Sequence, residues 1–328
     1  KKLLFLLKIF TINYHLEAFI YEKTFIFFRS LCLFALWMFR IFHKFFFRAT
    51  KKAIFFAMDT SIEFNIYGDA SLLKEAQNVL TDLESEVSVT DPDSEIYKIN
   101  QDGTGTLTGN AGNLMQEALE MCRRTDGALD ISVYPIVRAW GFTTEEYQVP
   151  EETEIESLLP LVDYTKIQYD TATGNVSIPK GMTIDLGSIA KGYGGQLAAQ
   201  LLREKGVTSA LLNLGGNVQT IGSKPDGSPW QVGIQDPTGD TPMMVLSVSD
   251  QAVITSGVTN ATLNRTERLT GTLWDPSTGH PADSGLCRSR WLEKRWNLRC
   301  SFTSLFVMGT LRKPQHSGSK AMTLKLFF

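Results

Sequence analysis

The sequence predicts one domain that combines helices with β-strands, over residues 53–286 of a chain of 328. Two segments carry apolar residues at helical spacing, and a strand–turn–strand pattern surrounds residues 172–175. Further strand-like apolar runs follow as far as residue 257. Because no internal repeat or low-complexity linker interrupts these residues, we assign them to a single domain.

The first half of this domain begins with a strand and continues with helices. Residues 53–67 have the composition of a strand, and Ser71 is the expected cap of an amphipathic helix over 72–86. A polar loop follows, with a helix start at Asp93 or Ser94. A second amphipathic helix is predicted over 113–124.

The segment Gly127–Phe142 is apolar except for one acid, Asp130. An acid in such a segment must find hydrogen-bond partners or a ligand, so Asp130 is either a helix cap or satisfied buried acid, or a binding residue. Residues 143–162 are acidic and predict a loop with a short helix. The turn 172–175 then joins the two strands of a hairpin.

The central stretch of the chain is Thr183–Tyr193. Asp185 ends a short apolar, β-like run, and Gly187 and Ser188 turn the chain into a helix whose first turn carries Lys191. A helix start of this kind presents free backbone N–H groups and a positive dipole end to an anion, commonly a phosphate.

This helix is expected to end at Gly206, where a strand over 209–214 leads to Gly215 and Gly216 and a close approach of backbone to a ligand. The acid, the lysine and the glycine turns around a strand–helix–strand unit indicate a nucleotide site, and a plain packing unit is the alternative. Two strands, at 218–222 and 230–234, are expected to pair around a turn at 224–227. A further strand is expected at 253–257.

Composition excludes several classes of function. The net charge is −3, so no basic field indicates a nucleic-acid partner. The 4 cysteines lack C-x-x-C spacing and only 4 histidines are present, which argues against a zinc or histidine-based metal centre and against a disulfide framework.

Residues 1–52 differ from the rest, since they are rich in Phe, Lys and Arg. The apolar run 31–39 is about half as long as a membrane helix and fits the hydrophobic core of a signal peptide, but no small-residue cleavage site follows. The favoured interpretation is that this segment is not part of the domain, and a membrane-proximal anchor is the alternative.

Four stretches of the chain form an ordered set of motifs: Ala57–Thr60; Gly127–Asp130 with Pro135 and Trp140–Gly141; Asp185–Tyr193; and Asn213–Gly216. In this order they resemble the FAD:protein FMN transferases, the ApbE-type flavin transferases. Further matches to this family lie around Trp230–Pro237 and Asp275–Pro281 and at 255–257.

The resemblance implies a single α+β, T-fold-like domain with mixed or antiparallel sheets and packed helices. It implies binding of FAD and Mg²⁺, and transfer of FMN to a threonine of a target flavoprotein with release of AMP. The family's targets are commonly subunits of membrane redox complexes, which implies an exported or membrane-associated protein on the extracytoplasmic face.

The resemblance also implies roles for particular residues, although Met58 as plain core and Lys191 as a solvated helix residue remain alternatives. It implies no catalytic residue in this chain. It places two magnesium ligands, Ser188 through its backbone carbonyl and Thr303. The FAD contacts that it implies are Met58, Ala128, Leu129, Asp130, Asp185 and Lys191.

The sequence departs from the family after residue 270. Thr272 stands where the family has a histidine, or a few residues are missing there, and Arg299 stands where the family has the aspartate four residues before Thr303. A cation repels magnesium. Residues 287–328 are therefore assigned to an aberrant tail with a family-like remnant at 303–309, from reading-frame shifts near 287 and after 309 or from genuine divergence.

Three functions follow from these observations. The first is FMN transfer. The second is a catalytically impaired flavin-binding protein that has lost its metal-ligand aspartate and its base histidine. The third, an NAD(P) oxidoreductase, lacks the G-x-G-x-x-G pattern after a strand with an acid about twenty residues on.

Overall fold

The computed structural model describes residues 50–143, 146–236, 241–257, 274–282 and 288–293, with Phe34, Trp37 and Met38. For 255–257 and 288–293 it describes the backbone alone. The chain divides into two units, 1–50 and 51–328, and the strands and the helices α2–α7 named below all belong to the second.

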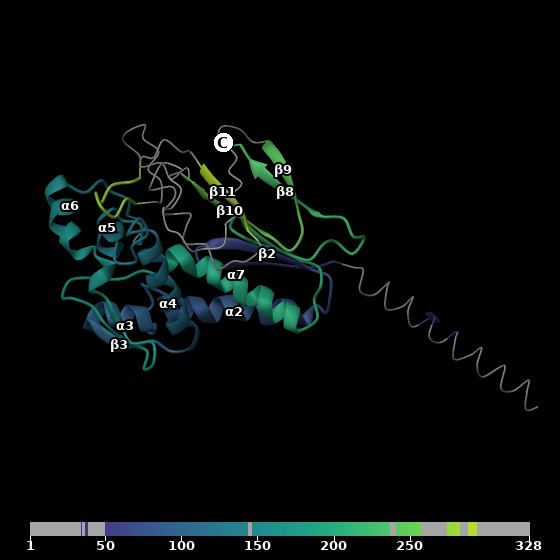
Figure 1. The fold of residues 1–328 in the computed structure, drawn as a ribbon, viewed down its shortest axis with the longest axis horizontal. Helices are drawn as coiled ribbons and strands as arrows, with labels where there is room; N and C mark the ends of the chain where they lie inside the picture. The colour runs from purple at the N-terminus through teal and green to yellow at the C-terminus, as the bar shows by residue number, and fades with distance from the viewer. Residues whose placement is uncertain are drawn as a thin grey trace, which may run out of the picture. The chain divides into compact units, whose positions relative to one another are not determined.

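A six-stranded antiparallel sheet forms the centre of this unit (Figure 1). The sequence prediction of one strand over 53–67 is wrong, because a two-residue turn at Met58 and Asp59 divides this segment into a hairpin. In sheet order the strands are β1 (Lys51–Ala57), β2 (Thr60–Ile66), β6 (Ala210–Leu214), β7 (Asn217–Ile221), β10 (Ala252–Gly257) and β11 (Arg288–Glu293).

Two long helices, α2 and α7, cover one face of this sheet (Figure 1). Ile62, Phe64 and Ile66 of β2 are fully buried in the core beneath them. Two of the helices, α2 (Ser71–Val87) and α4 (Gly109–Arg124), confirm the predicted amphipathic segments. Two others, α3 (Glu95–Asp102) and α7 (Gly187–Glu204), confirm the helices predicted to start near Ser94 and Gly187.

The hairpin of β8 (Trp230–Gln235) and β9 (Pro242–Val248) lies on the opposite face. Its apolar residues pack on Val218 and Val253 in a second core. The predicted pairing of 218–222 with 230–234 is wrong, because β7 pairs with β6 on one side and β10 on the other, which leaves no free edge for β8.

Smaller elements complete the unit. The predicted hairpin around 172–175 is confirmed as β4 and β5, to which β3 adds a third strand. These elements are β3 (Thr104–Thr106), β4 (Gln168–Tyr169), β5 (Asn175–Ser177), α5 (Tyr134–Ala139), α6 (Glu152–Leu158), and two short 3₁₀ helices, η1 (Leu159–Leu161) and η2 (Tyr164–Lys166).

Local capping was predicted with mixed success. Ser94 caps α3, since its Oγ accepts the Tyr97 N–H at 3.0 Å, and Gly206 follows α7 with a left-handed φ of 85°. Ser71 is not a cap, because it is the first helical residue and its N–H donates to the side chain of Asp69.

The predicted α+β fold class is confirmed. The prediction of a strand–helix–strand unit around residue 185 is wrong, because residues 183–186 form no strand. The sheet continues past residue 286 through β11, and it starts at Lys51. The boundaries at 52/53 and 286/287 remain predictions. Among the helices in the described part of the chain, none is long and apolar enough to span a bilayer.

Candidate functional site

Asp185 is held at the start of α7 by the backbone around it. Its neighbours Ile184 and Leu186 are fully buried, and its own N–H donates to the Ile131 carbonyl at 2.8 Å. Its carboxylate accepts the Gly187 N–H at 2.7 Å. The acid therefore lies beside the first amides of the helix, as the sequence predicted.

Two charged side chains, Asp59 and Lys191, act on the Asp185 carboxyl. Burial raises the pKa of the Asp185 carboxyl, and the nearby carboxylate of Asp59 raises it further. The Gly187 N–H and the Lys191 ammonium lower the same pKa without reversing the shift. Asp185 therefore keeps its proton more readily than an ordinary aspartate.

The turn between β1 and β2 has an unusual backbone. Met58 and Asp59 have φ values of 53° and 55°, a left-handed conformation that costs L-residues other than glycine about 1–2 kcal/mol each. The Met58 N–H donates to Oε1 of Glu84 on α2 at 2.7 Å. The Met58 side chain is buried, and its Cε lies 3.1 Å from where a Cβ on Gly194 of α7 would stand. Strain of this kind is common at functional sites.

The turn between β6 and β7 meets the turn between β1 and β2. Gly215 has a φ of 60°, and a Cβ on it would stand 2.2 Å from Oγ1 of Thr60. The N–H of Gly215 donates to the Ser61 carbonyl at 3.3 Å, and that of Gly216 to the Asn213 side chain at 2.9 Å. Within the described structure, Gly215 approaches Thr60 closely, whereas a Cβ on Gly216 would meet no atom within 4 Å. The predicted approach of this backbone to a ligand stays a prediction.

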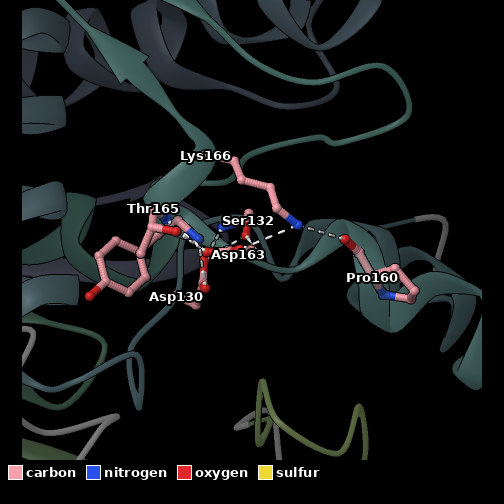
Figure 2. A network of polar contacts seen from close by, with 7 residues as sticks. Asp130, Ser132, Pro160, Asp163, Thr165 and Lys166 are labelled. Atoms are coloured by element: carbon pink, nitrogen blue, oxygen red, sulfur yellow. Dashed lines mark hydrogen bonds and ion pairs between the residues drawn. The ribbon is translucent and has the colours of Figure 1, made fainter.

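Asp130 lies in a polar network inside the protein (Figure 2). One carboxylate oxygen accepts the Ser132 N–H at 2.8 Å and the Ser132 hydroxyl at 2.6 Å, and the other accepts the Tyr164 N–H at 3.0 Å. The Ser132 Oγ in turn accepts the N–H of Asp163, which is paired with Lys166. This arrangement supports the satisfied buried acid, one of the two alternatives that the sequence left open.

We expect Asp130→Ala to lower the free energy of unfolding by about 2–3 kcal/mol, because it leaves buried donors of Ser132 and Tyr164 without an acceptor. Urea unfolding measures this loss, and Asp102→Ala, at an exposed position on α3, is the control. An unchanged stability with weaker ligand binding would instead favour Asp130 as a binding residue.

An aromatic cluster holds the segment Trp274–Pro281 against α5 and α6. The Trp140 indole N–H donates to the Gly279 carbonyl at 3.1 Å, and its ring stacks on Trp274 with centroids 5.0 Å apart. His280 pairs with Glu152 of α6 at 3.2 Å. Two stretches that were matched to the family separately, at 140–141 and at 275–281, are thus in direct contact.

Comparison with known proteins assigns the chain to a family. The model of the ApbE family matches residues 58–317, most of the chain. The chain belongs to the ApbE family. The resemblance that the ordered motifs indicated is confirmed.

Curated relatives in the ApbE family carry one name, FAD:protein FMN transferase. The chain is 29% identical to the FAD:protein FMN transferase of Vibrio cholerae, and the match covers 74% of this chain and 75% of that relative. It is 30% identical to that of Treponema pallidum over 72% and 71%. Among solved structures, the ApbE protein of Thermotoga maritima superposes with a TM-score of 0.75 at 28% identity, covering 79% of this chain and 87% of that one.

The structure brings part of the predicted ApbE site together. Met58 packs against α7, which also carries Ser188 and Lys191 near its start, and Asp185 directly precedes this helix. Leu129 is in the core, and Ala128 is partly exposed. Contacts of the described residues with FAD remain predictions.

The predicted magnesium site is incomplete in the described residues. Thr303 lies outside them, as do Thr272 and Arg299. Within the described ranges, no three His, Cys, Asp or Glu side chains form a group that could hold a metal ion. Ser188, exposed at the start of α7, is the one predicted ligand that the structure places. The described residues therefore do not supply a complete set of magnesium ligands by themselves.

Sequence reasoning missed two residues that fix this site, Glu84 and Asn100. Glu84 binds the backbone of Met58 from α2, and Asn100 binds the backbone of Ile184 from α3. Each contact joins residues far apart in the chain, and no local pattern in one sequence indicates it.

Proposed function

We propose that this protein is an FAD:protein FMN transferase. The supporting observation is the start of α7, where Asp185, Lys191 and the first helix amides lie together in a chain of the ApbE family. The relatives named for this activity span most of the chain, at about the same level of identity.

The reaction joins FMN to an acceptor hydroxyl. The hydroxyl oxygen of a target threonine forms a bond to the FMN phosphorus of FAD, the phosphoanhydride bond to the AMP half breaks, and the hydroxyl proton passes to solvent or a base. Charge increases on the departing phosphate of AMP, and Lys191, near the start of α7, is the residue proposed to stabilise it. The N–H groups of Gly187, Ile189 and Ala190 already donate to Asp185 and to the Leu186 carbonyl, so they take no part in this proposal. No described residue is assigned as the base.

Magnesium dependence is part of this proposal. A bound magnesium ion would neutralise negative charge on the pyrophosphate of FAD. Ser188 and Thr303 are its proposed ligands in this chain, and the other donors would have to come from FAD and from residues outside the described ranges.

The proposed partner is a target flavoprotein with an acceptor threonine, a subunit of a membrane redox complex. We further propose an exported or membrane-associated protein on the extracytoplasmic face. Tagged full-length protein in fractionated cells would test this proposal, because recovery in the cytosol alone contradicts it.

Two assays of the purified full chain test the activity. Quenching of flavin fluorescence measures FAD binding, and chromatography measures AMP release with Mg²⁺ or with EDTA. Co-expression with a candidate flavoprotein then shows covalent flavin as a fluorescent band in a denaturing gel. Transfer that requires Mg²⁺ supports the proposal, and failure to bind FAD contradicts it.

The second candidate function is flavin binding without transfer. It is favoured by Arg299, which stands where the family resemblance places a magnesium-binding aspartate. It predicts FAD binding without AMP release and without a covalent flavin band, so the same assays separate the two functions. Arg299→Asp should then restore Mg²⁺-dependent transfer.

A further inference from the structure

The backbone N–H and C=O groups of Ile184, beside Asp185, have no partners from a helix or a strand of their own. Residues 183–186 belong to no strand or helix, yet Ile184 is fully buried. Buried backbone N–H and C=O groups are nearly always hydrogen-bonded, because leaving one unpaired costs about as much as a lost hydrogen bond. The polar groups of Ile184 therefore need a donor and an acceptor nearby.

One side chain satisfies both groups of Ile184. Oδ1 of Asn100 accepts the Ile184 N–H at 2.7 Å, and Nδ2 of Asn100 donates to the Ile184 carbonyl at 2.9 Å. The amide of Asn100 thus pairs with this residue as the backbone of a neighbouring strand would. Its helix is anchored next to it by Ile96 and Ile99, which are buried in the main core.

The next residue along the chain is Asp185, whose N–H is bound by Ile131. Three hydrogen bonds from two separate segments therefore fix this backbone. Two of them hold the C=O and the N–H of the Ile184–Asp185 peptide, and the third holds the N–H of the peptide before it. This backbone sets where the Asp185 carboxylate stands relative to the first amides of α7. A group fixed before its ligand arrives costs less to order on binding.

We propose that Asn100 is a positioning residue, whose side chain holds Asp185 in place for the pyrophosphate-bearing substrate. The inference rests on the function proposed above and deepens it. Asn100 binds the Ile184 backbone and acts through Asp185.

The test compares Asn100→Ala with Asn78→Ala, an asparagine at an exposed position on α2. FAD affinity is measured by fluorescence titration in EDTA, at a temperature where both variants are folded by circular dichroism. We expect Asn100→Ala to raise the FAD dissociation constant about tenfold and Asn78→Ala to leave it unchanged. A folded Asn100→Ala variant with wild-type affinity would falsify the inference.

Hydrogen exchange separates this inference from the proposed function. In the FAD-free wild type, we expect slow exchange at the amides of Ile184 and Asp185, and faster exchange there alone in Asn100→Ala. Slow exchange at Ile184 and Asp185 in a protein that does not bind FAD would contradict the proposed function but still support the positioning of Asp185.

The wild-type measurement also decides the matter if Asn100→Ala does not fold. Fast exchange at Ile184 and Asp185 in the free protein, slowed only by FAD, would show that the ligand orders this stretch. The positioning role would then be wrong.

Discussion

Replacing Lys191 with alanine should reduce FMN transfer by about 10²–10³-fold, the usual loss when one group that stabilises developing charge is removed. Lys191 lies near the start of α7, close enough to Asp185 for its charge to lower the pKa of that carboxyl. It is the cation that the proposed mechanism sets beside the breaking phosphoanhydride bond. The rate of AMP release from FAD at saturating Mg²⁺ measures the effect.

Lys180→Ala is the matched control, because Lys180 is an exposed lysine in the loop that precedes the site. We expect Lys180→Ala to change the free energy of unfolding by no more than about 0.5 kcal/mol, as surface substitutions usually do. Lys191 is partly buried, so its variant is assayed at a temperature where it is folded by circular dichroism. If Lys191→Ala keeps the wild-type rate, Lys191 is a solvated helix residue, the alternative that the sequence left open.

Gly215→Ala should lower the free energy of unfolding by about 3 kcal/mol and weaken FAD binding with it. The added Cβ would stand 2.2 Å from Oγ1 of Thr60 and 3.0 Å from both its Cβ and its Cγ2. Rotation of the Thr60 side chain cannot remove all three contacts, so the two turns must move apart. The left-handed φ of 60° adds backbone strain. Urea unfolding and FAD titration measure the two effects.

Gly109→Ala controls for the backbone term, since Gly109 has a similar φ of 50° and no atom within 4 Å of an added Cβ. It should cost about 1 kcal/mol. Thr60→Ala in the Gly215→Ala background removes Oγ1 and Cγ2 and should recover part of the lost stability. Equal losses for the two glycines, with no recovery, would show that the turns do not press on each other.

Helices were predictable from the sequence because their signals are local. Gly187 and Gly206 mark the two ends of α7, and Ser94 marks the start of α3. The turn at Met58 and Asp59 was missed because both residues adopt a backbone conformation that normally indicates glycine or asparagine.

Strand partners were harder to predict than strands. The turn after β7 predicted that β8 would pair with β7. Both edges of β7 are hydrogen-bonded to β6 and β10, so β8 cannot join the large sheet beside it. The same limit applies to the site. Asp185 and Lys191 follow from one local motif, whereas Glu84 and Asn100 reach the site from other helices.

The order of strands in the large sheet constrains how the protein folds. The hairpin of β1 and β2 is local and can form early, but its next neighbour is β6, which is separated from it by all the helices from α2 to α7. Pairing between such distant segments closes a long loop and slows folding. The turns at Met58 and Gly215 meet only when β2 and β6 have paired. The candidate site is therefore expected to assemble late, after most of the chain has left the ribosome.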